Sequence, residues 1–337
     1  MMKKTHILWL ALAAALIPSC AKNGKAGLND ANKEYIESWI KLNYPGADRT
    51  NLGSYILKDD PGSGELVGDG GQSPYVIAHY NVADMDGKIQ NTTEESVAKR
   101  IGTYQESNTY SPVIWDRVDR NFHIGTEEVI SSMRVGGKRK VLIPGWLLTY
   151  DKYATEKEYM DHVSGTNAIY EISILETVSD IVKWEVDSIG NWLSHNHPSV
   201  SVKDSTYFGY YYIRTAEPES ERSFPQDTTV YINYTGRLLN GKVFDTTIAD
   251  TAKVHKIYNA SKSYGPVSVK IGELYSDLEL GGSTVIDGFA MMVHNMHPFE
   301  AGKAIFYSPL GYKEEGSGST IPGYSPLIFE VQVTKKP

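Results

Sequence analysis

The chain has 337 residues, of which 41% are hydrophobic and 22% charged, which is ordinary for a globular protein with room for two domains. Its net charge of −8 offers no basic surface to a polyphosphate, so we expect no nucleic-acid partner. The 23 tyrosines suit half-buried sheet faces and grooves.

The N-terminal segment predicts export. Lys3 and Lys4 precede an apolar run from Ile7 to Ile17, which is too short to span a bilayer and suits the core of a signal peptide. The segment Ile17-Pro18-Ser19-Cys20 resembles a bacterial lipobox, in which the cysteine is acylated and becomes the mature N-terminus.

We therefore expect a lipoprotein signal peptide at 1–19, lipidation at Cys20 and a flexible tether at 20–30. The protein would be lipid-anchored in the bacterial cell envelope, at the outer membrane, with its soluble domains facing the periplasm or the cell surface. The alternative is an ordinary secretory signal, which would leave Cys20 without a role. As the one cysteine of the chain, Cys20 has no partner for an intramolecular disulfide.

The elements expected after this segment occur as two series in the same order. Each series has a helix ended by proline, a tyrosine-rich strand, an alternating strand, a short helix and a last strand. In the first series these are residues 32–45, 55–57, 76–80, 126–133 and 168–175. In the second they are residues 179–198, 210–213, 230–234, 288–296 and 327–333. Because strands dominate, we expect an α+β fold in each series: a curved antiparallel sheet wrapped on the short helix and preceded by an N-terminal helix.

The two series lie at an almost constant distance along the chain. The matching positions are 153 or 154 residues apart: Trp39 and Trp192, Pro45 and Pro198, Tyr80 and Tyr234, Gly87 and Gly241. Such an offset across a helix, a strand and a turn predicts a duplicated module, rather than one large domain with chance similarity. We place the first module at 31–180 and the second at 181–337.

Short motifs from Thr228 to the C-terminus carry a family resemblance. In chain order they are Tyr234-Thr235-Gly236, Gly241-Lys242-Val243-Phe244-Asp245, Val285-Ile286-Asp287-Gly288-Phe289, Gly302-Lys303-Ala304, Gly311-Tyr312, Ile321-Pro322 and Leu327-Ile328-Phe329-Glu330-Val331. Their order resembles that of the FKBP-type peptidyl-prolyl cis-trans isomerases. The first module resembles the family more faintly, through Tyr80, Gly87-Lys88, Gly125, Met133 and Val135-Gly136.

The resemblance implies an apolar, aromatic groove in the second module. Its catalytic residues would be Tyr234, Phe244, Asp245, Ile286, Phe289 and Tyr312, and its further substrate-binding residues Val267, Val285, Ile321 and Phe329. Phe289 would be the floor, where many relatives have tryptophan. Val267 replaces a usual phenylalanine and follows a segment, 246–266, that is longer than usual. The family places the Ile286 N–H and the Tyr312 hydroxyl on substrate carbonyls, with Asp245 as a polar anchor.

This groove suits the isomerisation of X-Pro bonds in proline-containing polypeptide clients. The isomers interconvert over a barrier of about 20 kcal/mol in tens of seconds, slowly enough to limit folding. No bond is broken, so we expect no cofactor, no metal and no general base. The planar amide is the more dipolar form and loses more on leaving water, so an apolar groove favours the twisted amide.

The first module departs from this pattern at its groove positions. Gln90 and Asn91 stand where the second module has Phe244 and Asp245, and His123 and Thr126 stand where it has Ile286 and Phe289. Tyr80 and Tyr170 remain, although both also serve as ordinary core or sheet aromatics. We interpret this module as degenerate, keeping the fold without the proline pocket; a shallow polar groove with another ligand is the alternative.

Other candidate sites have simpler explanations. The histidines at 195, 197, 294 and 297 lack a recognised metal-ligand spacing, so no metal site is expected. The glycine-rich stretches 68–73 and 316–319 are expected to be loops rather than phosphate sites. Glu127 and Glu128 suit the first turn of a helix better than a catalytic pair.

Two classes of function remain. One is a peptidyl-prolyl isomerase that assists protein folding in the cell envelope, with its activity in the second module. The alternative is a non-enzymatic protein- or peptide-binding scaffold built from FKBP-like modules.

Overall fold

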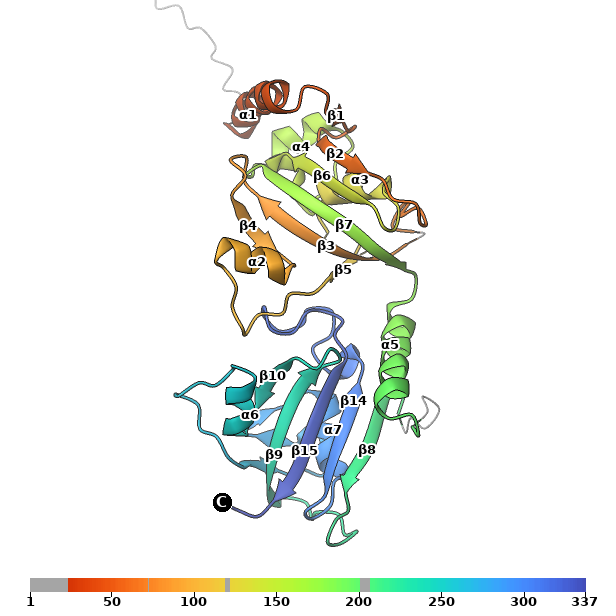
Figure 1. Cartoon of the computed structure of the whole chain (residues 1–337), viewed down its shortest axis with the longest axis vertical. Helices are drawn as coiled ribbons and strands as arrows, with labels where there is room; N and C mark the ends of the chain where they lie inside the picture. Colours follow the sequence, from red (N-terminus) through yellow and green to blue (C-terminus); the bar gives the residue numbers. More distant parts are fainter. Residues whose placement is uncertain (1–23, 72, 119–121, 201–206) are drawn as a thin grey trace, which may run out of the picture.

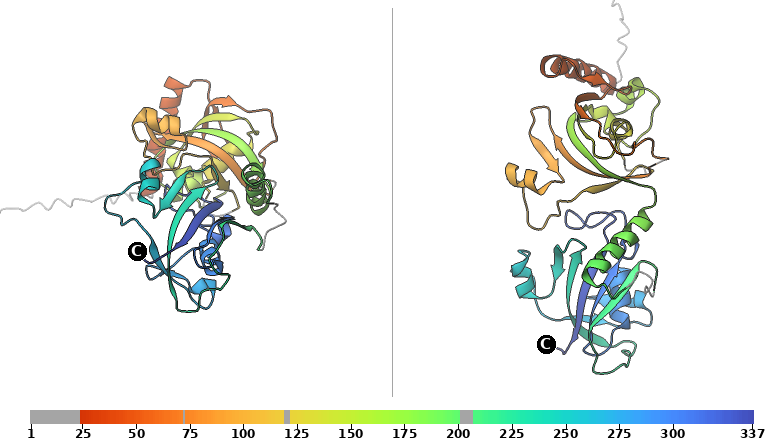
Figure 2. Two further views of the ribbon diagram at one scale, coloured as in Figure 1. Left: turned by 60° about the horizontal axis from the view of Figure 1, so that its bottom comes forward. Right: turned by 45° about the vertical axis from the view of Figure 1, so that its right-hand side comes forward.

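A computed structural model describes residues 24–71, 73–118, 122–200 and 207–337. These residues form two antiparallel sheets, each with helices packed on it, which confirms the expected α+β class. Figures 1 and 2 show the two modules stacked along the long axis of the molecule, with helix α5 leading from one to the other.

The first module is built around a seven-stranded sheet with the order β1-β2-β6-β7-β3-β4, and β5 also pairs with β3. Its strands are β1 (Asp48–Arg49), β2 (Tyr55–Asp60), β3 (Tyr75–Ala83), β4 (Ile89–Thr92), β5 (Val113–Asp116), β6 (Lys138–Ile143) and β7 (Ala168–Val178). Its helices are α1 (Gly24–Asn43), α2 (Glu95–Ile101), α3 (Ile124–Ser131) and α4 (Glu156–His162).

The second module has an eight-stranded sheet with the order β13-β12-β11-β9-β15-β14-β8, and β10 also pairs with β9. Its strands are β8 (Tyr210–Ala216), β9 (Thr229–Leu238), β10 (Val243–Thr246), β11 (Val267–Lys270), β12 (Glu279–Leu280), β13 (Ser283–Thr284), β14 (Ala301–Phe306) and β15 (Leu327–Thr334). Its helices are α5 (Ile181–Asn196), α6 (Ala249–Val254) and α7 (Asp287–Asn295).

The sheets repeat each other strand by strand. The pairings β2-β6-β7-β3 in the first sheet recur as β8-β14-β15-β9 in the second, and β4 and β5 flank β3 as β10 and β11 flank β9. A register shift between Val82 and Ala83 against β4 recurs as a shift between Val243 and Asp245 against β9. The duplication expected from the constant offset is therefore present in the backbone itself.

Alternation along the strands of the second sheet separates two apolar layers. Phe306 and Phe329 join the core cluster that contains Phe289, Met292 and Val293 of α7. Ile305 and Ile328, one position earlier on the same strands, instead pack with Ile189 and Leu193 of α5. The sheet is thus covered on both faces, which holds the strands that carry the candidate groove between two helices.

Helix α1 begins earlier than the sequence indicated. Residues 24–30, expected to be part of a tether, belong to α1. The Asn29 side chain is 3% exposed and its amide donates to the Met160 and Val163 carbonyls at 2.7 and 2.6 Å. These two hydrogen bonds reach the C-terminal end of α4, which is distant in the sequence. They stabilise the first turns of α1 through tertiary contacts that the local sequence pattern does not show. Cys20 and the signal segment lie outside the described residues.

The modules contact each other directly. Tyr324, from the segment before β15, donates its hydroxyl to Asp116 Oδ2 at 2.9 Å and meets the Tyr75 ring edge-on at 5.7 Å. Lys242 lies in the turn between β9 and β10, and its ammonium donates hydrogen bonds to the backbone carbonyls of Glu106 and Asn108. The Tyr324 contacts thus join the second module to strands β3 and β5 of the first, and the Lys242 contacts join it to the loop between α2 and β5.

A buried carboxyl joins α5 to the second module. Glu185 is 1% exposed, and it accepts hydrogen bonds from the Ser308 backbone N–H at 2.6 Å and from the Ser308 hydroxyl at 2.7 Å. Burial raises the pKa of Glu185 to about 7, and the two hydrogen bonds offset part of that rise.

Glu185→Gln is expected to remove a pH dependence of stability. The carboxyl of the folded protein keeps a proton that the unfolded chain releases near pH 4.5. The contribution of Glu185 to the free energy of unfolding therefore declines as the pH rises from about 4.5 to about 7. The decline is on the order of 3 kcal/mol. Urea unfolding at pH 5 and pH 8 should show a smaller difference for Glu185→Gln than for the wild type. Asp187→Asn, on the exposed side of the same helix, should behave as the wild type, and a matching response of both variants would contradict the assignment.

Candidate active site

The strands β9 and β10 bring a tyrosine and a carboxylate together. Tyr234 lies on β9, and the bulge in β10 between Val243 and Asp245 turns the Asp245 side chain so that the Tyr234 hydroxyl donates to Oδ2 at 2.6 Å. Burial, and then the hydrogen bond to the Asp245 carboxylate, raise the pKa of Tyr234, so the phenol stays protonated.

Two further groups hold Asp245 in place. The Thr246 N–H donates to Oδ1 at 2.8 Å, and the Lys262 ammonium forms an ion pair with the same oxygen. Lys262 belongs to the long segment between β10 and β11. The carboxylate is therefore a fixed acceptor at the groove wall, with each oxygen already oriented.

An aromatic cluster forms the floor beside this pair. The Phe289 ring, from the first turn of α7, lies 5.5 Å from Tyr234 and 5.0 Å from Phe329. Phe244 meets Phe329 edge-on at 5.6 Å. Phe289 and Phe329 are 3% and 5% exposed, whereas Tyr234 and Phe244 are only partly buried. The cluster thus has a buried base and an accessible rim, as a site for an apolar ring requires.

The N-terminus of α7 presents a backbone donor to the same region. Ile286 is the N-cap, with φ −63° and ψ 145°, and its carbonyl accepts from the Phe289 and Ala290 N–H groups at 3.1 and 3.0 Å. Within the described parts of the chain, the Ile286 N–H donates no hydrogen bond. This donor is free for a ligand carbonyl, and the helix end favours partial negative charge there.

The remaining predicted residues border the cluster. Val267 on β11, Val285 before α7 and Tyr312 after β14 are partly buried against it, and Ile321 is 4% exposed within it. Burial, and then the charge of Asp245, raise the pKa of the Tyr312 phenol, so this hydroxyl stays protonated and able to donate a hydrogen bond. Nine of the ten predicted groove residues thus belong to one apolar cluster or pack against it, and Asp245 is connected to it through the hydrogen bond with Tyr234.

The long segment between β10 and β11 has a defined fold that the sequence reading missed. The Tyr258 and Tyr264 rings stack at 5.1 Å, the Asn259 N–H donates to the Tyr264 hydroxyl at 2.9 Å, and the Lys253 ammonium lies 5.6 Å from the Tyr258 ring. We call residues 249–264 the second tyrosine clasp. This unit positions Lys262 so that its ammonium forms the ion pair with Asp245.

The first module contains the same unit at residues 95–110, the first tyrosine clasp. Tyr104 and Tyr110 stack at 5.4 Å, the Gln105 N–H donates to the Tyr110 hydroxyl at 3.1 Å, and the Lys99 ammonium lies 4.7 Å from the Tyr104 ring. Each residue stands 154 positions before its counterpart. The shared Lys-x4-Tyr-x5-Tyr spacing was the available signal.

The first module's groove has a different surface. Asn91 Nδ2 lies 3.4 Å from the Tyr80 hydroxyl, a weak counterpart of the tyrosine–carboxylate pair, and Gln90 is exposed and donates to Asp84 Oδ2 at 2.9 Å. Trp115, which the sequence reading did not single out, stacks on Tyr80 at 5.8 Å. His123 is the N-cap of α3, as Ile286 is of α7, which confirms the alignment of the two copies.

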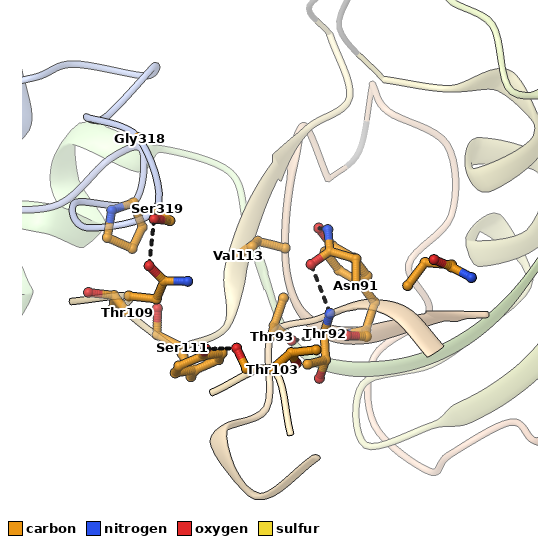
Figure 3. A pocket seen from close by; sticks show the side chains of 14 residues that line it. Asn91, Thr92, Thr93, Thr103, Thr109, Ser111, Val113, Gly318 and Ser319 are labelled. Carbon is orange, nitrogen blue, oxygen red and sulfur yellow. Dashed lines mark hydrogen bonds between the residues drawn. The ribbon is translucent and has the colours of Figure 1, made fainter. Parts of the chain in front are cut away.

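A cleft of about 460 Å³ opens at this groove. Figure 3 shows Asn91, Thr92 and Thr93 lining one side, and Gly318 and Ser319 of the second module facing them. Most of the lining side chains are hydroxyls and amides. The cleft therefore lacks the aromatic wall that Phe244 gives the second module.

The two adjacent acidic residues of α3 have structural partners. Glu127 is in the first turn of α3, as expected, and pairs with Arg117, whereas Glu128 lies one residue beyond that turn and accepts from the Leu52 N–H at 2.6 Å. Within the described ranges, no three His, Cys, Asp or Glu side chains are grouped as metal ligands. His297 Nδ1 lies 2.8 Å from Glu300 Oε2.

Comparison with known proteins points to one family. Residues 220–334 match the family described as FKBP-type peptidyl-prolyl cis-trans isomerase. The chain is similar to the peptidyl-prolyl cis-trans isomerase FKBP9 of Rattus norvegicus, at 24% identity over 77% of this chain and 34% of that protein. It is similar to the probable FKBP-type isomerase FkpA of Neisseria meningitidis, at 30% identity over 43% of each.

Two more comparisons each cover less than half of this chain. FK506-binding protein 2 of Dictyostelium discoideum is 34% identical over 30% of this chain and 60% of that protein. The crystal structure of a peptidyl-prolyl cis-trans isomerase from Pseudomonas syringae is 20% identical and covers 48% of this chain and 98% of that chain, with a TM-score of 0.33. The chain thus spans between about a third and 60% of the length of these three curated relatives.

Proposed function

We propose, from the premise that residues 220–334 belong to the FKBP-type peptidyl-prolyl cis-trans isomerase family, that the second module isomerises X-Pro bonds in polypeptide clients. The observation that carries the proposal is the convergence of Phe244, Phe289 and Phe329 with an unpartnered donor, the Ile286 N–H. An apolar base with a small number of fixed polar groups is the arrangement that a proline ring and its flanking carbonyl require.

The chemistry follows from differential binding. The proline ring enters the aromatic cluster, and the peptide leaves water. Desolvation raises the free energy of the planar, dipolar amide more than that of the twisted amide, so the barrier falls. The Ile286 N–H and the Tyr312 hydroxyl hold the flanking carbonyls, and Asp245, fixed by Tyr234 and Lys262, keeps the wall in place.

The test is the isomerisation rate of an X-Pro peptide with the intact chain, measured by exchange spectroscopy so that no protease is needed. Enzyme at a small fraction of the peptide concentration should accelerate cis-to-trans exchange in proportion to its own concentration. Binding of the peptide without acceleration would instead establish the scaffold alternative.

The first module gives the scaffold alternative its support. Gln90 and Thr126 occupy the positions of Phe244 and Phe289, and Thr126 is 3% exposed, so this module offers no aromatic rim of that kind. A protein in which one module retains the groove and the other has lost it can bind clients at two unlike surfaces. Saturable peptide binding by Phe244→Ala would assign binding to the first module.

We also propose attachment to the bacterial cell envelope through a lipid on Cys20, with both modules outside the cytoplasm. Among the residues that the structure describes, no helix is long and apolar enough to cross a membrane. The proposal rests on the N-terminal motif alone.

Cys20→Ser is expected to abolish fatty-acid incorporation and to leave an unprocessed or soluble protein. The measurement is metabolic labelling with a fatty acid, followed by membrane fractionation. Ser19→Ala, beside the modified residue, serves as the control and should label normally. Recovery of unlabelled wild-type protein in the soluble periplasmic fraction would contradict the anchor.

A further inference from the structure

The first tyrosine clasp holds an X-Pro segment of the second module. The Thr109 N–H donates to the Ser319 carbonyl at 2.8 Å, and the Thr109 hydroxyl donates to the Thr320 carbonyl at 2.6 Å. The segment continues as Ile321-Pro322. Thr109 therefore binds the carbonyls of the residues three and two positions before a proline.

A tight turn presents this segment. Gly316 and Gly318 have φ of +66° and +54°, and a Cβ on Gly316 would lie 2.2 Å from the Ile321 carbonyl oxygen, so glycine is required there. The Ser319 hydroxyl also donates to Asn108 Oδ1 at 2.7 Å. The glycine-rich stretch that the sequence showed as a loop thus forms a turn, in which the Thr320 and Ile321 N–H groups donate to the Ser317 carbonyl, and the Ser319 and Thr320 carbonyls point to the neighbouring clasp.

The gripped segment faces the first module's groove. Gly318, Ser319 and Pro322 border the same cleft as Tyr80 and Asn91, and Figure 3 shows Thr109 and Ser319 on one side of it. Tyr80 and Asn91 are the counterparts of Tyr234 and Asp245. A chain held on a clasp in this way therefore lies beside the groove of the module that owns the clasp.

The second clasp has the same parts beside the intact groove, and no residue that the structure describes is bound on it as Ser319 and Thr320 are bound on the first. Ser263 stands 154 residues after Thr109, between Lys262, which reaches Asp245, and Tyr264 of the ring stack. Ser263 is exposed, and none of the described residues accepts from its N–H or its hydroxyl. It carries the same two donors as Thr109.

We propose that Ser263 forms a subsite for clients, in which its N–H and hydroxyl bind the carbonyls of the residues three and two positions before the proline. This inference rests on the proposed function and adds a specificity to it. Since the ligand groups are backbone carbonyls, the subsite recognises the presence of chain before the proline, not its side chains. Clients with at least three residues before the proline are then preferred over prolines that lie closer to a free N-terminus.

The experiment uses the full chain and two peptides with a free N-terminus and an amidated C-terminus that share the same Leu-Pro-Phe core, so that the short peptide has neither carbonyl. The short peptide has one residue before the proline, and the extended peptide has four. For the wild type we expect kcat/KM to be about tenfold higher for the extended peptide, the gain from two hydrogen bonds. Ser263→Pro, which removes both donors, should bring the ratio of the two kcat/KM values to about one. Ser263→Ala, which removes only the hydroxyl and spares the backbone, should lower it about threefold.

The control is Ser268→Ala, an exposed serine on β11 that should keep the wild-type ratio. An unchanged ratio in both Ser263 variants would overturn the subsite while leaving the isomerase proposal intact. If neither the wild type nor any variant accelerates the isomerisation of either peptide, the isomerase proposal fails. The subsite is then tested by measuring the affinity for the two peptides. Equal affinity of the wild type for the two peptides would then overturn the subsite, and tighter binding of the extended peptide by the wild type but not by Ser263→Pro would support it.

Discussion

Phe244→Ala in the intact chain is expected to lower kcat/KM for an X-Pro peptide by roughly 10- to 100-fold, the loss typical of an aromatic anchor in a binding pocket. The Phe244 ring forms the exposed part of the cluster and contacts the buried Phe329, so its removal opens the wall that encloses the proline ring. Truncating a fully buried aromatic costs about 3–5 kcal/mol of stability. Phe244 is only partly buried, so the melting temperature should change little while activity falls.

Gln90→Ala is the matched control, because Gln90 occupies the same strand position in the first module. Its side chain is exposed and bonds Asp84, away from an aromatic wall, so kcat/KM should stay at the wild-type value. Tyr312→Ala should act like Phe244→Ala, since it removes a carbonyl donor. A fall in activity with Gln90→Ala, or none with Phe244→Ala, would show that the activity is assigned to the wrong module.

Arg117→Met is expected to destabilise the first module by about 3–5 kcal/mol, the usual cost of removing one partner from a buried ion pair. The Arg117 side chain is 0% exposed and donates to both Glu127 carboxylate oxygens, at 2.7 and 2.5 Å. It also donates to the Gly68 and Ser73 carbonyls at 2.7 and 3.0 Å. Methionine fills similar volume without replacing any of these bonds, so a carboxylate and two carbonyls lose their donor.

Thermal unfolding followed by circular dichroism measures this effect. A loss of that size lowers the melting temperature of a module of about 150 residues by roughly 10 °C. Lys99→Met breaks an ion pair whose side chains are more than half exposed, so it should not shift the transition measurably. Equal shifts for the two variants would mean that the Arg117 network has no special role in the core.

Much of the candidate groove could be predicted because its residues lie close together within short stretches of sequence. Tyr234 and Asp245 are on adjacent strands joined by a tight turn, and Val285, Ile286 and Phe289 lie within one helix start. Local geometry alone brings members of each stretch together. Phe329 and Tyr312 come from distant parts of the chain, and only the family resemblance connected them to the rest.

The sequence by itself determined the duplicated module, the α+β class and the difference between the two grooves. All three follow from residue identity and spacing: a 154-residue offset, strand alternation, and Gln90 and Thr126 in place of Phe244 and Phe289. Only the tertiary structure decided that residues 24–30 join α1, that Lys262 pairs with Asp245, and that Thr109 grips the segment before Pro322. These contacts join residues that are 131, 17 and 211 positions apart. Their formation depends on how the chain packs between elements, which no local pattern of residues encodes.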